Sequence, residues 1–144
     1  MKGQPINSSV FKALGGSSPE KLFGGLKTPC YIIDEGALED NLKILKGVSE
    51  RTGAKILLAQ KAFSNFAFYP LISRYLCGTE ASGLFEARLG KEEMPCGEVH
   101  VFCAAYRDDE FEELLSYADH IVFNSPSQLK KFGARAKARG KSVG

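Results

Sequence analysis

Short apolar strands alternate with amphipathic helices at a nearly constant interval along most of this sequence. The predicted strands begin near residues 31, 55, 79, 99, 120 and 142, so the interval is 20 to 24 residues. That spacing is typical of one repeated strand–helix unit. Strands of one sheet that are joined by helices run parallel, with right-handed crossovers. The repeat therefore predicts an α/β fold with a parallel sheet.

Several local signals define the repeated units. The strand over 55–60 (KILLAQ) is an almost unbroken apolar run, which is typical of a strand buried on both faces. Asp34 can cap the helix that follows the strand 31–33, and Gly53 ends that helix. The other predicted strands are 79–82, 99–103, 120–123 and 142–143, and the other predicted helices are 68–76, 84–89, 109–117 and 127–139.

Two architectures accommodate this repeat, a doubly wound open sheet and a (β/α)8 TIM barrel. A barrel needs about 250 residues for eight units, whereas this chain has 144. In the barrel case, residues 28–144 hold the first five units and the start of a sixth strand, so we expect a truncated barrel. Residues 1–27 are expected to form an irregular lead, because Gly, Ser and Pro interrupt the apolar positions, with one short helix at 10–14.

Charge and hydropathy argue against two classes of partner. The 19 basic and 17 acidic residues leave a net charge of +2, whereas a large nucleic-acid footprint needs a strong basic excess. The basic run 130–141 is interpreted as the solvated face of a helix, with a nucleic-acid patch as the alternative. The longest uncharged run, 62–73, is too short to cross a membrane, and no signal peptide is evident. We expect a cytoplasmic protein without nucleic-acid or membrane partners.

The cysteines and histidines do not form a metal-binding pattern. The cysteines form no CxxC pair, have no His at ligand spacing and are too sparse for a disulfide framework. They are Cys30, Cys77, Cys96 and Cys103. His100 lies within a predicted strand and His120 at the start of another, far from the strand ends where ligands bind. We therefore expect reduced thiols, structural histidines and no metal.

Lys61 is the strongest candidate for chemistry. It directly follows the strand 55–60, at the carboxyl end where parallel α/β folds bind ligands. If Lys61 faces inward, strand alternation turns Ala59 and Leu57 inward too, and the small Ala59 leaves room for a flat ring. A partly desolvated lysine there is a nucleophile that can form a Schiff base with an aldehyde. From spacing alone, the alternative is an ordinary solvated lysine.

Six stretches of the sequence, taken together, resemble one enzyme family. They are 28–34 (TPCYIID), 55–64 (KILLAQKAFS), 78–90 (GTEASGLFEARLG), 98–106 (EVHVFCAAY), 108–111 (DDEF) and 118–128 (ADHIVFNSPSQ). In this order they are similar to the fold-type III decarboxylases, which depend on pyridoxal 5'-phosphate. The resemblance covers about residues 26–144. It implies an alanine racemase-like (β/α)8 barrel followed by a β domain, a homodimer, and Lys61 as the lysine that forms the Schiff base with the cofactor.

The resemblance also suggests residues around that cofactor. Thr79 matches a position near its ring, and Ala59, Ser82 and Glu86 are expected to be cofactor-binding residues. If the strand 79–82 alternates, Thr79 and Ala81 point inward. From the residues alone, Ser82 is equally well explained as a strand-end hydroxyl, and Glu86 as an acid on a helix surface.

Two further residues lie at strand ends on the same predicted rim, Tyr106 and Asn124. They rank lower as candidates, because turn chemistry alone explains an asparagine there.

The implied reaction is the decarboxylation of a small carboxylated polyamine. Two alternatives stay open. One is another fold-type III enzyme, such as a diaminopimelate decarboxylase or an alanine racemase relative. The other is a non-catalytic fragment, since the resemblance places the phosphate-binding loops and the β domain later in the family's chain than residue 144.

Overall fold

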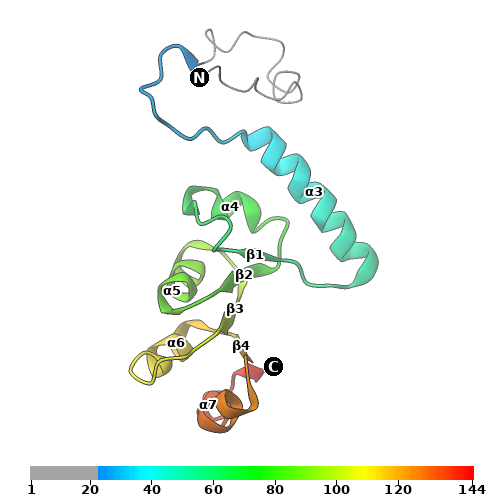
Figure 1. The fold of residues 1–144 in the computed structure, drawn as a ribbon. Coiled ribbons are helices and arrows are strands. Elements are labelled where there is room, and N and C mark those ends of the chain that lie inside the picture. The colour runs from blue at the N-terminus through cyan, green and yellow to red at the C-terminus, as the bar shows by residue number, and fades with distance from the viewer. Residues whose placement is uncertain (1–22) are drawn as a thin grey trace. The chain divides into compact units, whose positions relative to one another are not determined.

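The computed structural model describes residues 23–144, which form five strands with helices between them (Figure 1). The structure divides into two units, with the boundary between residues 41 and 42. Residues 1–22, with the predicted helix at 10–14, lie outside the described part. The elements are α3 (Glu35–Thr52), β1 (Leu57–Ala59), the 3-10 helix η1 (Phe66–Phe68), α4 (Tyr69–Ile72), β2 (Gly78–Ala81), α5 (Leu84–Glu93), β3 (Glu98–Cys103), α6 (Phe111–Tyr117), β4 (His120–Phe123), α7 (Pro126–Ala138) and β5 (Ser142–Val143).

The five strands form one parallel sheet in the order β1-β2-β3-β4-β5. Figure 1 shows α5 and α6 on the same side of these strands. Each strand pairs with the next one along the chain, so the order does not reverse as it does at the first strand of a doubly wound sheet. The predicted parallel α/β fold is confirmed, and the strand order is consistent with part of a barrel.

The predicted strand at 31–33 is wrong. These residues have no strand conformation in the described structure. A β-branched run supplies strand propensity, but backbone groups need a neighbouring strand to form a ladder. The described residues therefore contain four strand–helix units and a fifth strand, rather than five units and the start of a sixth strand.

The predicted helix at 68–76 is also too long. The 3-10 helix η1 precedes a four-residue α4, which ends at Ile72. Turns follow, with Tyr75 N–H and Leu76 N–H donating to Ile72 O, and they bring Cys77 N–H to within 2.9 Å of Ile56 O. This hydrogen bond begins the pairing of β2 with β1, so the helix gives way to the entry of the next strand.

The hydrophobic core lies between one face of the sheet and helices α5, α6 and α7. Ala81, Val99, Val101 and Ile121 present this face and are fully buried. The helices contribute Leu84, Ala87, Phe111, Leu114, Leu115, Phe132 and Ala136. The Phe111 and Phe132 rings pack against each other in a tilted arrangement, with their centroids 4.4 Å apart. Side chains alternate along each strand, so the core fixes which residues face the opposite side of the sheet.

The basic run at 130–141 lies mostly on α7, where several of its charges pair with acids near α6. Lys131 Nζ is 2.5 Å from Asp108 Oδ2, and Arg135 Nε is 2.8 Å from Glu112 Oε1. The Arg135 guanidinium also lies over the Phe111 ring, 5.0 Å from its centroid. These contacts agree with the interpretation of the run as the solvated face of a helix. No helix among residues 23–144 is both long enough and apolar enough to span a bilayer.

The face of the sheet opposite the helices carries a histidine pair. His100 and His120 are register partners on β3 and β4, with ring centroids 5.0 Å apart. His100 Nε2 lies 2.9 Å from Glu98 Oε2, and His120 Nδ1 lies 2.7 Å from Ser142 Oγ. Glu98 also accepts a hydrogen bond from Lys55 Nζ. The two histidines thus join three neighbouring strands at their amino ends, in a structural role.

This pair predicts a loss of stability in mild acid. Burial, and then the nearby charge of His100, lower the pKa of His120 below its ordinary value of 6.5. Neutral His120 therefore favours the folded state above pH 6.5, and this contribution is lost as the pH falls through the lowered pKa. Thermal unfolding should show a Tm that falls by a few degrees between pH 7.5 and pH 5.5. Glu98, whose pKa is lowered mainly by its hydrogen bond from Lys55, loses its contribution only below about pH 4.5.

The variant His120→Asn separates this effect from general acid denaturation. Its amide can still reach Ser142 Oγ but does not take up a proton in this range. The fall in Tm between pH 7.5 and pH 5.5 should be smaller in His120→Asn than in the wild type. Equal falls in the two proteins would contradict the assignment.

Candidate active site

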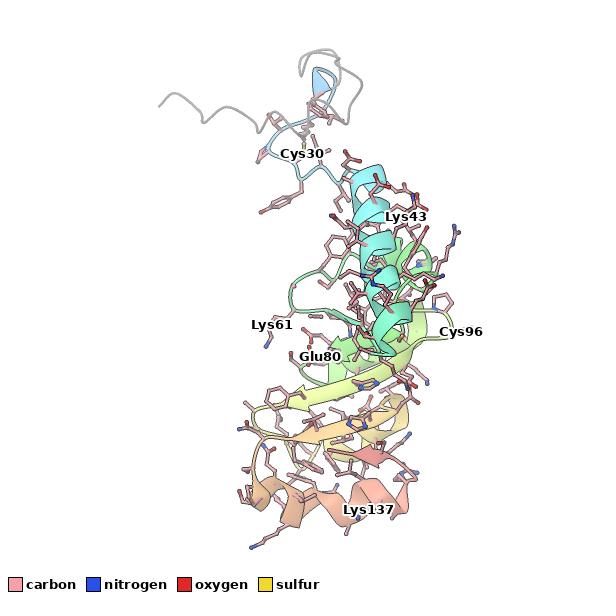
Figure 2. All side chains as sticks on the ribbon, turned by 90° about the vertical axis from the view of Figure 1, so that its right-hand side faces the viewer. Cys30, Lys43, Lys61, Glu80, Cys96 and Lys137 are labelled. Carbon is pink, nitrogen blue, oxygen red and sulfur yellow. The ribbon has the colours of Figure 1, made fainter. Side chains whose placement is uncertain are left out.

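Lys61 lies in a tight turn that directly follows β1. Ala62 N–H and Phe63 N–H donate to Ala59 O over 3.0 and 3.2 Å, which folds the chain back at the end of the strand. Figure 2 shows Lys61 and Glu80 close together, at the edge toward which the strands point. Lys61 is exposed in the described structure, and its partial desolvation stays a prediction. Its placement at the carboxyl edge of the sheet is confirmed.

Glu80 is the residue near Lys61 that the sequence reasoning missed. Its register partner on β1 is Ala59, which precedes Lys61 by two residues. Burial raises the pKa of the Glu80 carboxyl first, the nearby Glu86 charge raises it further, and the Lys61 charge opposes both. The electrostatics therefore couple one amine with two carboxylates. A charged residue inside a short buried strand was the available signal.

Thr79 and Ala81 do not face the side of the sheet that carries Lys61, so their expected inward orientation is wrong. Thr79 is fully buried and packs against Gly90 of α5 so closely that a Cβ built on Gly90 would lie 2.3 Å from Thr79 Oγ1. Ala81 belongs to the core beneath α5 and α6. Strand alternation then places Glu80 on the opposite face. Thr79 Oγ1 is the one buried side-chain oxygen or nitrogen of the described residues without a hydrogen-bond partner.

Ser82 and Glu86 meet at the start of α5. Ser82 N–H donates to Glu86 Oε2 over 2.6 Å, so the Glu86 carboxylate satisfies a backbone donor in front of the helix. Both residues are half-buried, and Ala59 is exposed. The structure thus brings Ala59, Ser82 and Glu86 to the same edge as Lys61. The charges of Lys61 and Glu86 both act on the Glu80 carboxyl, in opposite directions. Their roles toward a cofactor stay a prediction.

The Tyr106 side chain binds backbone carbonyls, whereas Asn124 is exposed and has its own backbone N–H bound by a side chain. The Tyr106 hydroxyl lies 2.7 Å from Val122 O and 3.1 Å from Val101 O, so it ties β3 to β4. Burial raises the pKa of Tyr106 far above its ordinary value, which keeps the phenol neutral. Asn124 N–H donates to Gln128 Oε1 in the turn that leads into α7. Turn geometry explains Asn124, as expected.

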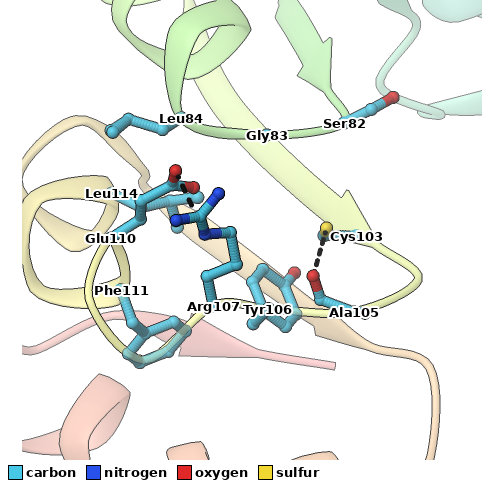
Figure 3. Close-up of a pocket in the computed structure, with 10 residues that line it drawn as sticks. All are labelled: Ser82, Gly83, Leu84, Cys103, Ala105, Tyr106, Arg107, Glu110, Phe111 and Leu114. Atoms are coloured by element: carbon cyan, nitrogen blue, oxygen red, sulfur yellow. Dashed lines mark hydrogen bonds and ion pairs between the residues drawn. The ribbon is translucent and has the colours of Figure 1, made fainter.

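A pocket lies between the start of α5 and the loop from β3 to α6 (Figure 3). Its wall includes Ser82, Tyr106 and Arg107. The polar groups of the wall are largely paired within it or nearby. Arg107 Nε lies 3.4 Å from Glu110 Oε1, and the Cys103 thiol donates to Ala105 O over 3.2 Å.

The cysteines are free thiols in the described structure, as expected. Among residues 23–144, no group of three or more His, Cys, Asp and Glu side chains is placed to hold a metal ion.

The lysine and the two carboxylates thus lie at the carboxyl edge of a parallel α/β sheet, which is where such folds bind ligands. No family model matches the chain. The chain is similar to a carboxynorspermidine/carboxyspermidine decarboxylase from Herminiimonas arsenicoxydans, with 39% identity over 118 residues, which is 82% of this chain and 32% of that protein. A protein of the same name from Campylobacter jejuni is 40% identical over 119 residues, 83% of this chain and 30% of that protein.

Two further comparisons agree. A carboxyaminopropylagmatine decarboxylase from Synechocystis is 36% identical over 107 residues, 74% of this chain and 27% of that protein. The crystal structure of carboxynorspermidine decarboxylase from Campylobacter jejuni, complexed with norspermidine, superposes with a TM-score of 0.77 at 39% identity, covering 82% of this chain and 31% of that chain. The chain is thus similar to part of the carboxynorspermidine/carboxyspermidine decarboxylases, and it spans about a third of their length.

Proposed function

We propose that the protein containing this chain decarboxylates carboxynorspermidine and carboxyspermidine to norspermidine and spermidine, with Lys61 as its catalytic lysine. The observation that carries the proposal is the place of Lys61 at the carboxyl edge of the parallel sheet, beside Glu80, in a chain about 40% identical to decarboxylases of these substrates. The third relative, which is named for carboxyaminopropylagmatine, favours a related substrate as a second candidate.

The residues at this edge fit pyridoxal 5'-phosphate as the cofactor. An exposed primary amine can attack its aldehyde, and the small exposed Ala59 leaves room beside the amine. Thr79 offers nothing to the cofactor from this side of the sheet, because it faces α5. When bound, the cofactor supplies a sink for the electrons that carbon dioxide leaves behind.

The carboxylates at this edge have their own roles in the proposal. Glu80 holds the cationic amine of Lys61 at the strand end by charge attraction. Its raised pKa brings it closer to the range in which a carboxyl exchanges protons with a neighbouring base. Glu86 fixes the start of α5 through Ser82 N–H and adds negative charge that attracts a cationic polyamine.

The rest of the proposal rests on the family resemblance. The parallel sheet would be part of an alanine racemase-like (β/α)8 barrel, made of residues 28–144 and a segment beyond this chain. The remaining barrel and a β domain would hold the cofactor phosphate and the substrate, in a cytoplasmic homodimer. These parts correspond to the two thirds of the relatives that this chain does not span.

Product analysis with four substrates tests the proposed function. The complete protein, loaded with pyridoxal 5'-phosphate, should release norspermidine and spermidine from the two carboxylated polyamines. Carboxyaminopropylagmatine is the third substrate and meso-diaminopimelate the fourth. A preference for diaminopimelate would favour the other fold-type III alternative, and no turnover of any substrate would favour the non-catalytic one. The 144-residue chain alone should show little or no turnover.

A further inference from the structure

Gln60, the residue directly before Lys61, has a buried side chain that joins several elements. It is polar and ends an apolar strand, yet its side chain is only 1% exposed. Its Oε1 accepts a hydrogen bond from the Tyr69 hydroxyl over 3.0 Å, and its Nε2 donates to Glu86 O over 2.8 Å. Its backbone N–H donates to Glu80 O over 3.1 Å. One residue thus connects the Lys61 turn with β2, α4 and α5.

Burying the Gln60 amide costs free energy, which an apolar side chain at this position would avoid. A buried amide loses its hydrogen bonds to water and must recover them inside the protein, whereas an apolar side chain of similar size has no such need. Tyr69, the donor to Gln60, is fully buried, and burial raises the pKa of its hydroxyl, so it stays a neutral donor. The amide is therefore fixed from two sides, by α4 and by α5.

The two backbone acceptors around Gln60 belong to the acids of the candidate site. Glu80 O receives its backbone N–H, and Glu86 O receives its side chain. The Glu80 carboxyl interacts electrostatically with both Glu86 and Lys61, and Glu86 accepts a further hydrogen bond from Ser82 N–H. Because Gln60 is bonded to Lys61 through the peptide chain, it sets the place of the lysine relative to both carboxylates.

We propose that Gln60 is a positioning residue, which holds the turn of Lys61 in register with Glu80 and Glu86 through its buried hydrogen bonds to Tyr69 and Glu86. The inference rests on the proposed role of Lys61. A supporting residue of this kind does not touch the substrate but keeps the reacting amine within the narrow range of positions that its chemistry requires.

Two variants remove this support in different amounts. Gln60→Met has a similar volume and deletes both side-chain hydrogen bonds, whereas Tyr69→Phe deletes only the one to Oε1. The control is Ile72→Val, a buried change in the same helix as Tyr69 that leaves the amide intact. Circular dichroism and thermal melting establish that each variant is folded.

The measurement is the rate at which pyridoxal 5'-phosphate becomes attached to Lys61 in the complete protein, trapped with borohydride and located by peptide mapping between pH 6 and pH 9. We expect Gln60→Met to slow labelling by at least about tenfold, because the amine is no longer held in place. We also expect the part of the pH profile that follows Glu80 to move to higher pH, because the Lys61 charge then opposes the raised pKa of that carboxyl less. Tyr69→Phe should shift the profile in the same direction by less. Ile72→Val should keep the wild-type profile, since a loss of stability alone does not move it.

The outcomes separate this inference from the proposed function. Wild-type labelling of Lys61 together with a wild-type profile in Gln60→Met overturns the inference and leaves the proposed function standing. If Gln60→Met does not fold, a wild-type profile in Tyr69→Phe overturns it in the same way. Absence of label at Lys61 in the wild-type protein overturns both.

Discussion

Replacing Lys61 by alanine is expected to reduce decarboxylation of carboxynorspermidine by the complete protein by at least about a thousandfold. The variant loses both the amine that attacks the cofactor and the group that exchanges protons at the end of β1. The side chain is exposed, so its removal should leave Tm nearly unchanged. Initial rates of norspermidine formation, measured alongside a thermal melt, give both values.

Two companions sharpen this experiment. Lys61→Arg should be as inactive as the alanine variant, because a guanidinium stays protonated and cannot act as the nucleophile. Lys137→Ala, an exposed lysine on α7, should keep the wild-type rate. Full turnover by Lys61→Ala would show that the reaction does not depend on this amine.

Gly78→Ala is expected to be the most destabilising single change in the sheet. Gly78 has φ of +154°, and a Cβ on it would lie 1.9 Å from Glu98 O and 2.5 Å from Glu98 N. These are backbone atoms of the paired strand β3, so relief requires separation of β2 from β3. The loss should be at least about 3 kcal/mol, which corresponds to a fall in Tm of roughly 10 °C for a chain of this size.

Gly83→Ala is the matched control. Its φ of 179° is ordinary extended backbone, and a Cβ there meets no atom within 4 Å. Its cost should stay below about 0.5 kcal/mol. Thermal and urea unfolding of the two variants compares them directly. A Tm for Gly78→Ala within a degree or two of the control would mean that β2 and β3 do not approach as closely as described.

The repeat of apolar strands was sufficient to predict a parallel sheet, because burial on both faces imposes the same composition on every central strand. The same reasoning failed at 31–33. That run has the composition of a strand, but pairing depends on a neighbour that local sequence does not specify.

The candidate site was predictable in part. The positions of Lys61 and Ala59 at the strand end could be predicted, because the apolar run at 55–60 marks the strand and its carboxyl end. The strand β2 has only four residues, too few for composition to determine which of them face the helices. Thr79 was therefore assigned to the wrong side and Glu80 was missed. The close packing of Gly90 against Thr79 decides the orientation, and it depends on a tertiary contact.

The position of the attached cofactor tests the proposed function most directly. The complete protein is incubated with pyridoxal 5'-phosphate, reduced with borohydride, digested and mapped by mass spectrometry. The label should be found on the peptide that contains Lys61, and it should be absent from the Lys61→Ala variant. Label on another lysine, such as Lys55 at the opposite end of β1, together with an unlabelled Lys61, would contradict the assignment of this edge as the active site.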